Sequence, residues 1–315
     1  MQDQRYVPMH ANRRHFLHLS LLCGTSSLLG WKLIAADEEN ESWQAYELQK
    51  EWILPLFTKK KSPGPNDWLT SHPEKGQTFA EYRAVNPNRP TAVRNKIYLQ
   101  QIGDFSTVHA KLLKTLQQFM TIIFGLEVKF LPAKNLAIIP KEAQRTNPFV
   151  GQRQLLTTYI LNQLLKPERP ADAVAVLAIT NVDLWPGENW NFVFGQASLV
   201  ERVGVWSTAR MGNPVKEAQL FMRRVLQVAV HETGHIFGIK HCIAYECCMN
   251  GANHQGESDA APLVFCAECD AKLWWASRLD AAKRAKELAT FAAQYKLETD
   301  AIQWQKIAKA LEKKH

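Results

Sequence analysis

Three histidines and a glutamate lie close together at spacings that suit a metal site. His231 and His235 are four residues apart, so on a helix they project from one face and can hold one ion. Gly238 can end that helix with a positive φ angle, and the chain can then bring His241 back as a third ligand. Three neutral imidazoles leave the fourth position of zinc open, which is the arrangement of a catalytic zinc site.

Glu232 follows the first histidine directly and is suited to be the general base for a zinc-bound water. The alternative is that the histidines are only hydrogen-bonded at the end of a helix and bind no metal. The apolar residues of the predicted helix argue against it, because they form one stripe from which His231 and His235 project on the opposite side. These apolar residues are Ala218, Met222, Val225, Leu226, Ala229 and Ile236.

Five of the six cysteines are clustered just after the histidines. Two pairs, with four residues and two residues between their members, could supply four thiolates to a closed structural zinc: Cys242 with Cys247, and Cys266 with Cys269. Cys248 could replace its neighbour as a ligand or be a spare buried thiol, and disulfides are the alternative to a metal. Because Cys242 follows His241, the second zinc would support the third ligand of the first. We therefore predict two zinc ions per chain, one catalytic and one structural.

Residues 1–36 are typical of a twin-arginine signal. Arg13 and Arg14 precede an apolar run from Leu17 to Ile34, and Ala35-Ala36 after it is the candidate cleavage point. Because the run is short and Lys32 interrupts it, a stable membrane span is not expected. The prediction is a periplasmic or secreted protein, with a cytoplasmic protein as the alternative. Residues 37–95 read as an N-terminal extension, and residues 96–315 as a catalytic domain that includes a helical C-terminal part.

Composition describes an ordinary globular protein with 46% hydrophobic and 22% charged residues. The formal charge of +8 is partly carried by the predicted leader. The basic residues form no stripe with interleaved aromatic residues, so nucleic acid is not an expected partner. The expected partner is a peptide or protein substrate, and the sequence does not determine the oligomeric state.

Periodicity predicts alternating strands and helices, and hence a mixed, mostly parallel sheet. The predicted strands cover residues 97–102, 126–130, 173–179, 191–198 and 203–207. The predicted helices cover residues 38–57, 106–124, 147–164, a stretch from Asn213-Pro214 through the histidines, 271–295 and 299–313. A loop is expected over residues 183–187.

The histidine and cysteine pattern resembles that of the archaemetzincins, zinc peptidases of the metzincin clan. Their pattern places Cys-x-Met and then Cys-x-x-Cys after the histidine motif, and here Met249 follows Cys247 and Cys248. The spacer over residues 250–265 is one residue shorter than in the family. Residues 76–82 and 189–198 are similar to stretches of the eukaryotic-type members, and the resemblance covers about residues 45–280.

The resemblance implies an α+β fold with a twisted, mixed five-stranded sheet above a cleft and a smaller, helical lower subdomain with the structural zinc. Met249 would form an apolar floor beneath the zinc ligands. The strand with Gly195 and Ala197 would bind an extended substrate at the sheet edge. A zinc endopeptidase is the first expectation. A narrow aminopeptidase on short peptides and a non-catalytic peptide-binding module are the alternatives, and the presence of Glu232 argues against the module.

Overall fold

The computed structural model describes residues 42–312 of the chain. Residues 46–95 belong to the same compact unit as the rest of the described chain that follows them. The predicted leader over residues 1–36 lies outside the described residues, so export stays a prediction. Within residues 42–312, none of the helices combines the length and the apolar character that a membrane span requires.

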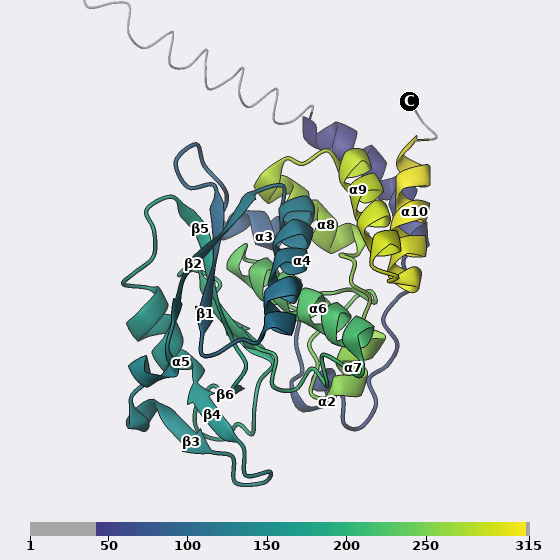
Figure 1. The fold of residues 1–315 in the computed structure, drawn as a ribbon. Helices are drawn as coiled ribbons and strands as arrows, with labels where there is room; N and C mark the ends of the chain where they lie inside the picture. The colour runs from purple at the N-terminus through teal and green to yellow at the C-terminus, as the bar shows by residue number, and fades with distance from the viewer. Residues whose placement is uncertain (1–41, 313–315) are drawn as a thin grey trace, which may run out of the picture. The chain divides into compact units, whose positions relative to one another are not determined.

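A five-stranded sheet forms the centre of the fold (Figure 1). Four strands are parallel and the last, at one edge, is antiparallel to its neighbour. All eight residues of the central strand β5 (Ala173–Thr180) are buried, as its near-continuous apolar run predicts. The α+β fold class with a mixed five-stranded sheet is thereby confirmed. In spatial order the strands are β2 (Glu127–Lys134), β1 (Lys96–Ile102), β5 (Ala173–Thr180), β8 (Val203–Ser207) and β7 (Gly195–Ala197).

A second sheet of three short strands replaces part of a predicted helix. Its strands are β3 (Gln144–Thr146), β4 (Arg153–Leu156) and β6 (Asp183–Trp185). The helix predicted from residue 147 is wrong, because the Asn147 side chain accepts the backbone N–H groups of Phe149 and Val150 and turns the chain back. Helical structure begins only afterwards, with α5 (Thr157–Tyr159) and a π-helical turn, Ile160–Leu165.

Three further element boundaries differ from those predicted. The strand expected over 191–198 is reduced to β7, and the loop expected over 183–187 begins with β6. The helix with the histidines, α6 (Ala218–Ile236), begins later than Asn213-Pro214 predicts. The Asn213 carboxamide accepts the N–H groups of Val215 and Lys216, which makes a turn before the helix.

Helices cover both faces of the five-stranded sheet. On one face, α4 (Thr107–Phe124) packs on β2, and α6 packs on β5, β7 and β8. The π-helical turn contacts β5 and β8 from the other face. A continuous cluster of buried apolar side chains, including Leu155, Ile160 and Val205, fills the space on this second face. The sheet and α4 therefore hold α6, the helix that carries the histidines, in place.

The chain after residue 254 is mostly helical but is interrupted. Its helices are α7 (Gln255–Ala260), α8 (Ala267–Ser277), α9 (Ala281–Gln294) and α10 (Glu298–Glu312). The single helix predicted over 271–295 is wrong, because Arg278 takes a left-handed φ of 55° and Asp280 caps a new helix by accepting the N–H of Lys283. Figure 1 shows α9 and α10 side by side, and α9 packs against α4.

The N-terminal extension runs along the rest of the fold with little regular structure. It comprises a helix over residues 42–53, a 3-10 turn (Leu54–Leu56) and the short helices α2 (Trp68–Ser71) and α3 (Phe79–Ala84). A β-bridge joins Lys59 to Tyr245, and the buried Tyr46 hydroxyl donates to Asp270 of α8 at 2.8 Å. Two further turns of 3-10 helix lie elsewhere in the described chain, at Leu136–Ile138 and Lys141–Ala143.

Candidate active site

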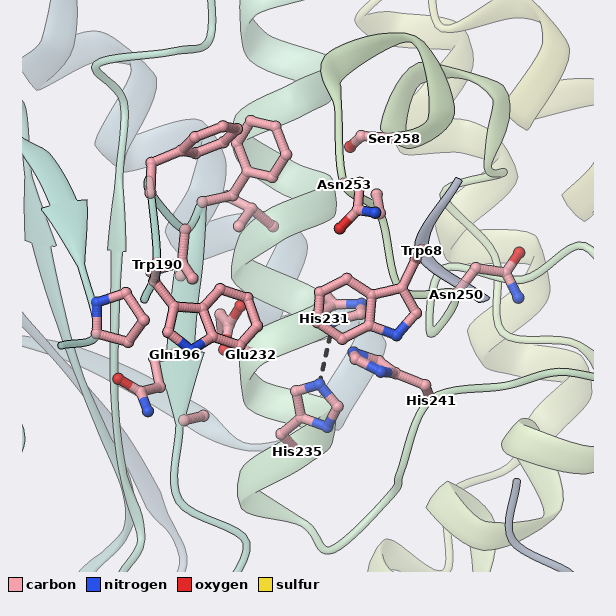
Figure 2. Close-up of a pocket in the computed structure, with 18 of the residues that line it drawn as sticks. Trp68, Trp190, Gln196, His231, Glu232, His235, His241, Asn250, Asn253 and Ser258 are labelled. Atoms are coloured by element: carbon pink, nitrogen blue, oxygen red, sulfur yellow. Dashed lines mark hydrogen bonds between the residues drawn. The ribbon is translucent and has the colours of Figure 1, made fainter. Parts of the chain in front are cut away.

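The last two turns of α6 carry His231 and His235, and the chain then reverses direction. Gly238 makes this reversal with a φ of 80°, and a Cβ atom at this position would lie 2.9 Å from Pro87 Cβ. Both the left-handed backbone and the close approach therefore require glycine. The reversal returns His241 to the two helical histidines. The ring centroids of the three imidazoles lie 4.6, 4.9 and 5.3 Å apart (Figure 2).

Each of the three imidazoles is fixed through its Nδ1 atom. His231 Nδ1 lies 2.8 Å from the Cys248 carbonyl, and His235 Nδ1 lies 2.7 Å from the Ile239 carbonyl. His241 Nδ1 lies 2.8 Å from a carboxylate oxygen of Glu74. These oxygens only accept hydrogen bonds, so each Nδ1 carries a proton, and in a neutral ring Nε2 then presents its lone pair to the space between the rings.

The arrangement of these lone pairs fits a bound cation. The Nε2 atoms of His231 and His235 lie only 3.1 Å apart, and two acceptors at this distance repel each other unless a positive charge lies beside them. Burial lowers the pKa of His231 to about 3 and that of His235 well below its usual value, so both rings are neutral, as metal ligands must be. One ligand atom from each histidine lies within 4.8 Å of the others, a donor set that suits zinc.

Glu232 lies beside the histidines as a buried carboxylate with an unused oxygen. Its side chain is 4% exposed, and Oε2 has no hydrogen-bond partner. A Cβ atom at Gly195 would lie 2.5 Å from Glu232 Oε1, so the edge strand β7 directly covers this carboxylate. Burial raises the pKa of Glu232 to about 8, and a cation at the histidines would lower it again.

Met249 lies beneath the helix, as the resemblance implies. It is fully buried, and a Cβ atom at Gly234 would lie 2.5 Å from its sulfur. The glycine in the histidine motif therefore makes room for the methionine. Because the carbonyl of the preceding residue, Cys248, accepts the Nδ1 hydrogen of His231, the same turn also fixes the orientation of the His231 ring.

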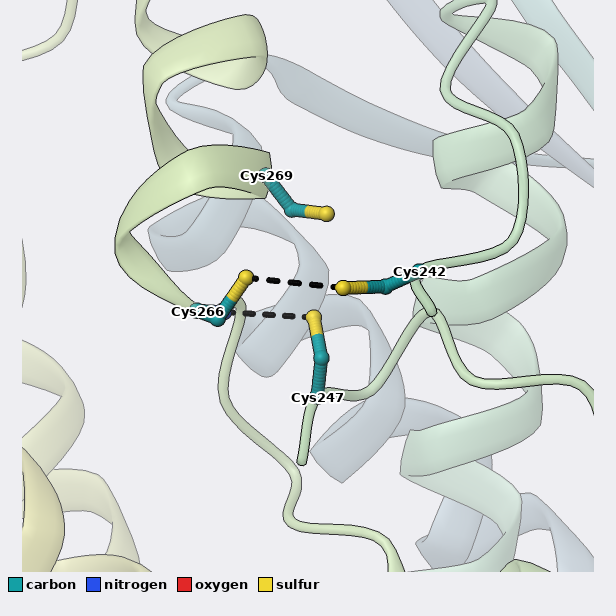
Figure 3. A group of neighbouring side chains, drawn as sticks. All are labelled: Cys242, Cys247, Cys266 and Cys269. Carbon is teal, nitrogen blue, oxygen red and sulfur yellow. Dashed lines mark hydrogen bonds between the residues drawn. The ribbon is translucent and has the colours of Figure 1, made fainter. Parts of the chain in front are cut away.

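The four predicted cysteine ligands converge in a second cluster (Figure 3). Their sulfur atoms lie within 4.8 Å of one another, and all four residues are buried. The Cys266 N–H donates to Cys247 Sγ at 3.2 Å, and the sulfurs of Cys242 and Cys266 lie 3.7 Å apart. Four buried thiols that converge in this way match the donor set of a structural zinc.

Cys248 lies outside this cluster. It is 1% exposed, and burial raises the pKa of its thiol, which is the behaviour of an inert buried cysteine. None of the five cysteines that the structure describes forms a disulfide. The geometry therefore favours the metal interpretation over disulfides, with Cys247 rather than its neighbour as the ligand.

Asn250 holds the loop between the two clusters and was not predicted from the sequence. Its carboxamide accepts the Cys247 N–H at 2.9 Å and donates to the carbonyls of Cys242 and Tyr245 at 2.7 and 2.9 Å. The Cys242 N–H donates to the Met249 carbonyl at 2.8 Å. The loop after His241 is therefore closed on itself, and it lies between the histidines and the cysteines.

Comparison with known proteins assigns this site to a family. The sequence profile of Peptidase family M54 matches residues 108–274. Archaemetzincin-2 of Homo sapiens is 34% identical over 268 residues, which cover 74% of this chain and 74% of that protein. The chain belongs to the archaemetzincins, Peptidase family M54. The predicted resemblance is thereby confirmed, and with it the enzyme class, a zinc-dependent metallopeptidase.

Two archaeal archaemetzincins match a smaller part of the chain. The protein of Archaeoglobus fulgidus is 33% identical over 178 residues, which cover 56% of this chain and 98% of that protein. The crystal structure of archaemetzincin from Methanopyrus kandleri is 28% identical, with a TM-score of 0.50, and the match covers 60% of this chain and 99% of that one. This archaemetzincin chain therefore has extensive sequence outside the archaeal match.

The edge strand of this archaemetzincin offers free backbone groups to the cleft. Ser207 N–H donates to the Phe194 carbonyl, and Ser198 N–H donates to the Val203 carbonyl. Hydrogen bonding alternates along an antiparallel pair, so Gly195 and Ala197, which lie between these bonds, direct their N–H and C=O groups away from β8. Both residues line a cleft of about 700 Å³ together with the three histidines and Glu232.

A bridge of aromatic rings crosses this cleft and was also not predicted. Trp68 and His72 of the N-terminal extension stack on each other with centroids 4.0 Å apart. His72 stacks on Trp190 at 5.2 Å, and the Trp68 ring meets His241 edge-on at 5.1 Å. Figure 2 shows Trp68 and Trp190 approaching each other from the two sides of the cleft. We call Trp68, His72 and Trp190 the aromatic bridge.

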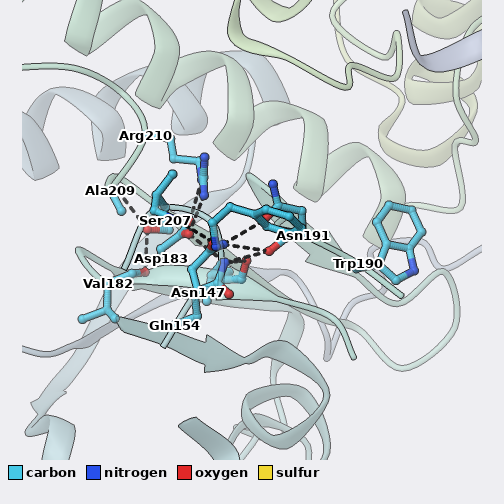
Figure 4. Close-up of polar contacts among 12 residues, drawn as sticks. Asn147, Gln154, Val182, Asp183, Trp190, Asn191, Ser207, Ala209 and Arg210 are labelled. Carbon is cyan, nitrogen blue, oxygen red and sulfur yellow. Dashed lines mark hydrogen bonds and ion pairs between the residues drawn. The ribbon is translucent and has the colours of Figure 1, made fainter. Parts of the chain in front are cut away.

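A buried polar network holds the loop that carries Trp190 (Figure 4). Arg210 makes two hydrogen bonds to Asp183, which is 2% exposed, and Gln154 joins Asp183 to the Asn191 carbonyl. Asn147 also donates to Asn191 at 2.8 and 3.2 Å. Charge-assisted and fully paired bonds of this kind rigidify a loop, so Trp190 is held at a fixed place on the cleft.

Proposed function

We propose that His231, His235 and His241 bind a catalytic zinc ion and that this protein hydrolyses peptide bonds with Glu232 as the general base. Zinc held there supplies Lewis-acid chemistry, because it acidifies water and polarises the peptide carbonyl. The observation that carries the proposal is the buried Glu232 carboxylate, whose Oε2 has no partner beside three converging Nε2 lone pairs.

The chain's own residues account for the proton transfers. Glu232 accepts a proton from the attacking water and then donates it to the nitrogen of the departing amine, which restores the carboxylate. The backbone groups of Gly195 and Ala197 pair with an extended substrate at the sheet edge. The buried Met249 and the Cys248 carbonyl keep His231 in place. A second, structural zinc at the four cysteines is supported by their convergence.

The proposal is tested with purified protein, a library of peptides and product mapping by mass spectrometry. We expect peptide cleavage that a zinc chelator abolishes and that added zinc restores. Metal analysis is expected to give two zinc ions per chain. If cleavage continues unchanged in the chelator after all zinc has been removed, the catalytic part of the proposal is wrong. If the protein binds peptides but cleaves none of them, it is the non-catalytic module.

The contact between Gly195 and Glu232 gives a sharp prediction. Gly195→Ala places a methyl group 2.5 Å from Glu232 Oε1, so the carboxylate must move. A displacement of about 1 Å at a catalytic group costs about 10²-fold in rate, and we expect a fall in kcat of this size with unchanged zinc content. The matched control is Gly64→Ala, whose new methyl group has its nearest neighbour at 3.4 Å. Equal kcat values for the two variants would contradict the prediction that a methyl group at residue 195 displaces the Glu232 carboxylate.

The aromatic bridge favours short peptides as substrates. A polypeptide that continues past the bridge must displace the stacking of Trp190 on His72, whereas a short peptide need not. We expect Trp190→Ala to raise kcat/KM several-fold for a long unstructured protein relative to a short peptide. Phe149→Ala removes an aromatic ring that is 77% exposed and outside the cleft, and serves as the control. An unchanged ratio in Trp190→Ala would show that the bridge does not select by length.

A further inference from the structure

The turn that delivers His241 is held by a segment far away in the sequence. Gln77 donates to the Gly238 carbonyl and accepts the Lys240 N–H. The buried Tyr82 hydroxyl donates to the Phe237 carbonyl at 3.0 Å. Phe237 is the C-cap residue of helix α6 and Gly238 follows it, so the bonds to these two carbonyls satisfy acceptors that a helix end leaves open.

This segment is itself fixed from the side of the cysteine cluster. Lys272 of α8 is 3% exposed, and its ammonium group donates to the backbone carbonyl and the side chain of Gln77. A buried lysine is stable only where its donors are satisfied. Gln77 is therefore held in one position, and α8, whose N-cap residue is Cys266, connects it to the four cysteines.

Glu74 is the member of this segment that reaches a histidine ring. Its Oε1 atom accepts from His241 Nδ1 at 2.8 Å and from Trp68 Nε1 at 2.9 Å. The carboxylate is 29% exposed, so it is partly shielded from water. The other two imidazoles donate to backbone carbonyls, which no substitution removes, whereas His241 depends on a side chain.

We propose that Glu74 is a positioning residue that holds His241 as the third zinc ligand, and that residues 74–82 form the support of this ligand. A carboxylate at Nδ1 fixes the tautomer and the orientation of a ligating imidazole and makes its Nε2 a stronger donor to the metal. The inference rests on the proposed zinc site. It also gives a physical role to the stretch over residues 76–82, which lies outside the match to the family profile.

The test is zinc affinity, measured by competition with a chromogenic chelator on the full chain. Glu74→Gln keeps an acceptor but removes the charge, and Glu74→Ala removes both. We expect zinc at the histidines to bind about 10-fold more weakly in Glu74→Gln and up to about 100-fold more weakly in Glu74→Ala. The zinc at the cysteines should be unchanged. With cobalt in place of zinc, the visible ligand-field spectrum of the histidine site should also change in both variants.

Glu81→Gln is the matched control. Glu81 belongs to the same segment and closes a capping box with Thr78 at the start of α3, so the same substitution perturbs the segment without touching His241. Equal zinc affinities and cobalt spectra in Glu74→Gln, Glu74→Ala and Glu81→Gln would overturn the inference. Failure of the zinc site itself has a different signature, because His231→Ala would then bind as much zinc as the unmodified protein.

Discussion

Glu232→Gln is expected to lower kcat by about 10²–10⁴-fold while both zinc ions remain bound. This is the range that a general acid–base residue contributes. Glutamine has the shape of glutamate, so the packing under Gly195 is kept, but its amide cannot accept the proton of the attacking water. The measurement is kcat on a peptide cleaved by the unmodified protein, with zinc content determined on the same samples.

The matched control for this prediction is Glu188→Gln. Glu188 is an exposed residue of the loop that carries Trp190, so the same chemical change is made close to the cleft but away from the histidines. Its kcat is expected to stay within a factor of about two of the unmodified protein, because exposed substitutions have small effects. Normal turnover by Glu232→Gln would remove Glu232 from the proton-transfer role and leave the zinc site intact.

The positions of site residues that are close together in the sequence could be predicted from the sequence. The period of the helix puts His231 and His235 on one face, and Gly238 marks where that helix must end. The structure brings both histidines together with His241 for these reasons. The continuous apolar run of β5 was likewise sufficient to predict a central strand, because only a strand covered on both faces buries every residue.

Contacts between distant segments could not be placed in this way. Glu74 and His241 are 167 residues apart, and a lone glutamate in a loop carries no periodic signal. Cys247 rather than Cys248 faces the four-cysteine cluster because of the bonds that the Asn250 carboxamide and the Cys266 N–H make to it, and both bonds depend on the folded loop. The wrong start of the helix at residue 147 has a local cause instead, because the Asn147 side chain accepts the N–H groups of Phe149 and Val150 and makes a turn there.

Cys247→Ala and Cys248→Ala are expected to differ strongly in zinc content and in the free energy of unfolding, although the two residues are neighbours. Both are buried, at 0% and 1% exposure, but only Cys247 lies in the four-cysteine cluster. Loss of one ligand should reduce the zinc content from two ions to one. Because structural zinc contributes directly to folding, we expect Cys247→Ala to lower the free energy of unfolding by more than about 4 kcal/mol.

Cys248→Ala removes a buried sulfur without a ligand role, and we expect two bound zinc ions and a loss of about 1 kcal/mol. Denaturant unfolding and metal analysis on the same preparations measure both quantities. Cys247→Ala should also weaken zinc at the histidines, because Cys242, which directly follows His241, would lose its anchor in the cluster. Equal zinc content and equal unfolding midpoints in the two variants would show that the four thiols hold no metal, and the turn at His241 would then depend on the N-terminal segment and Asn250 alone.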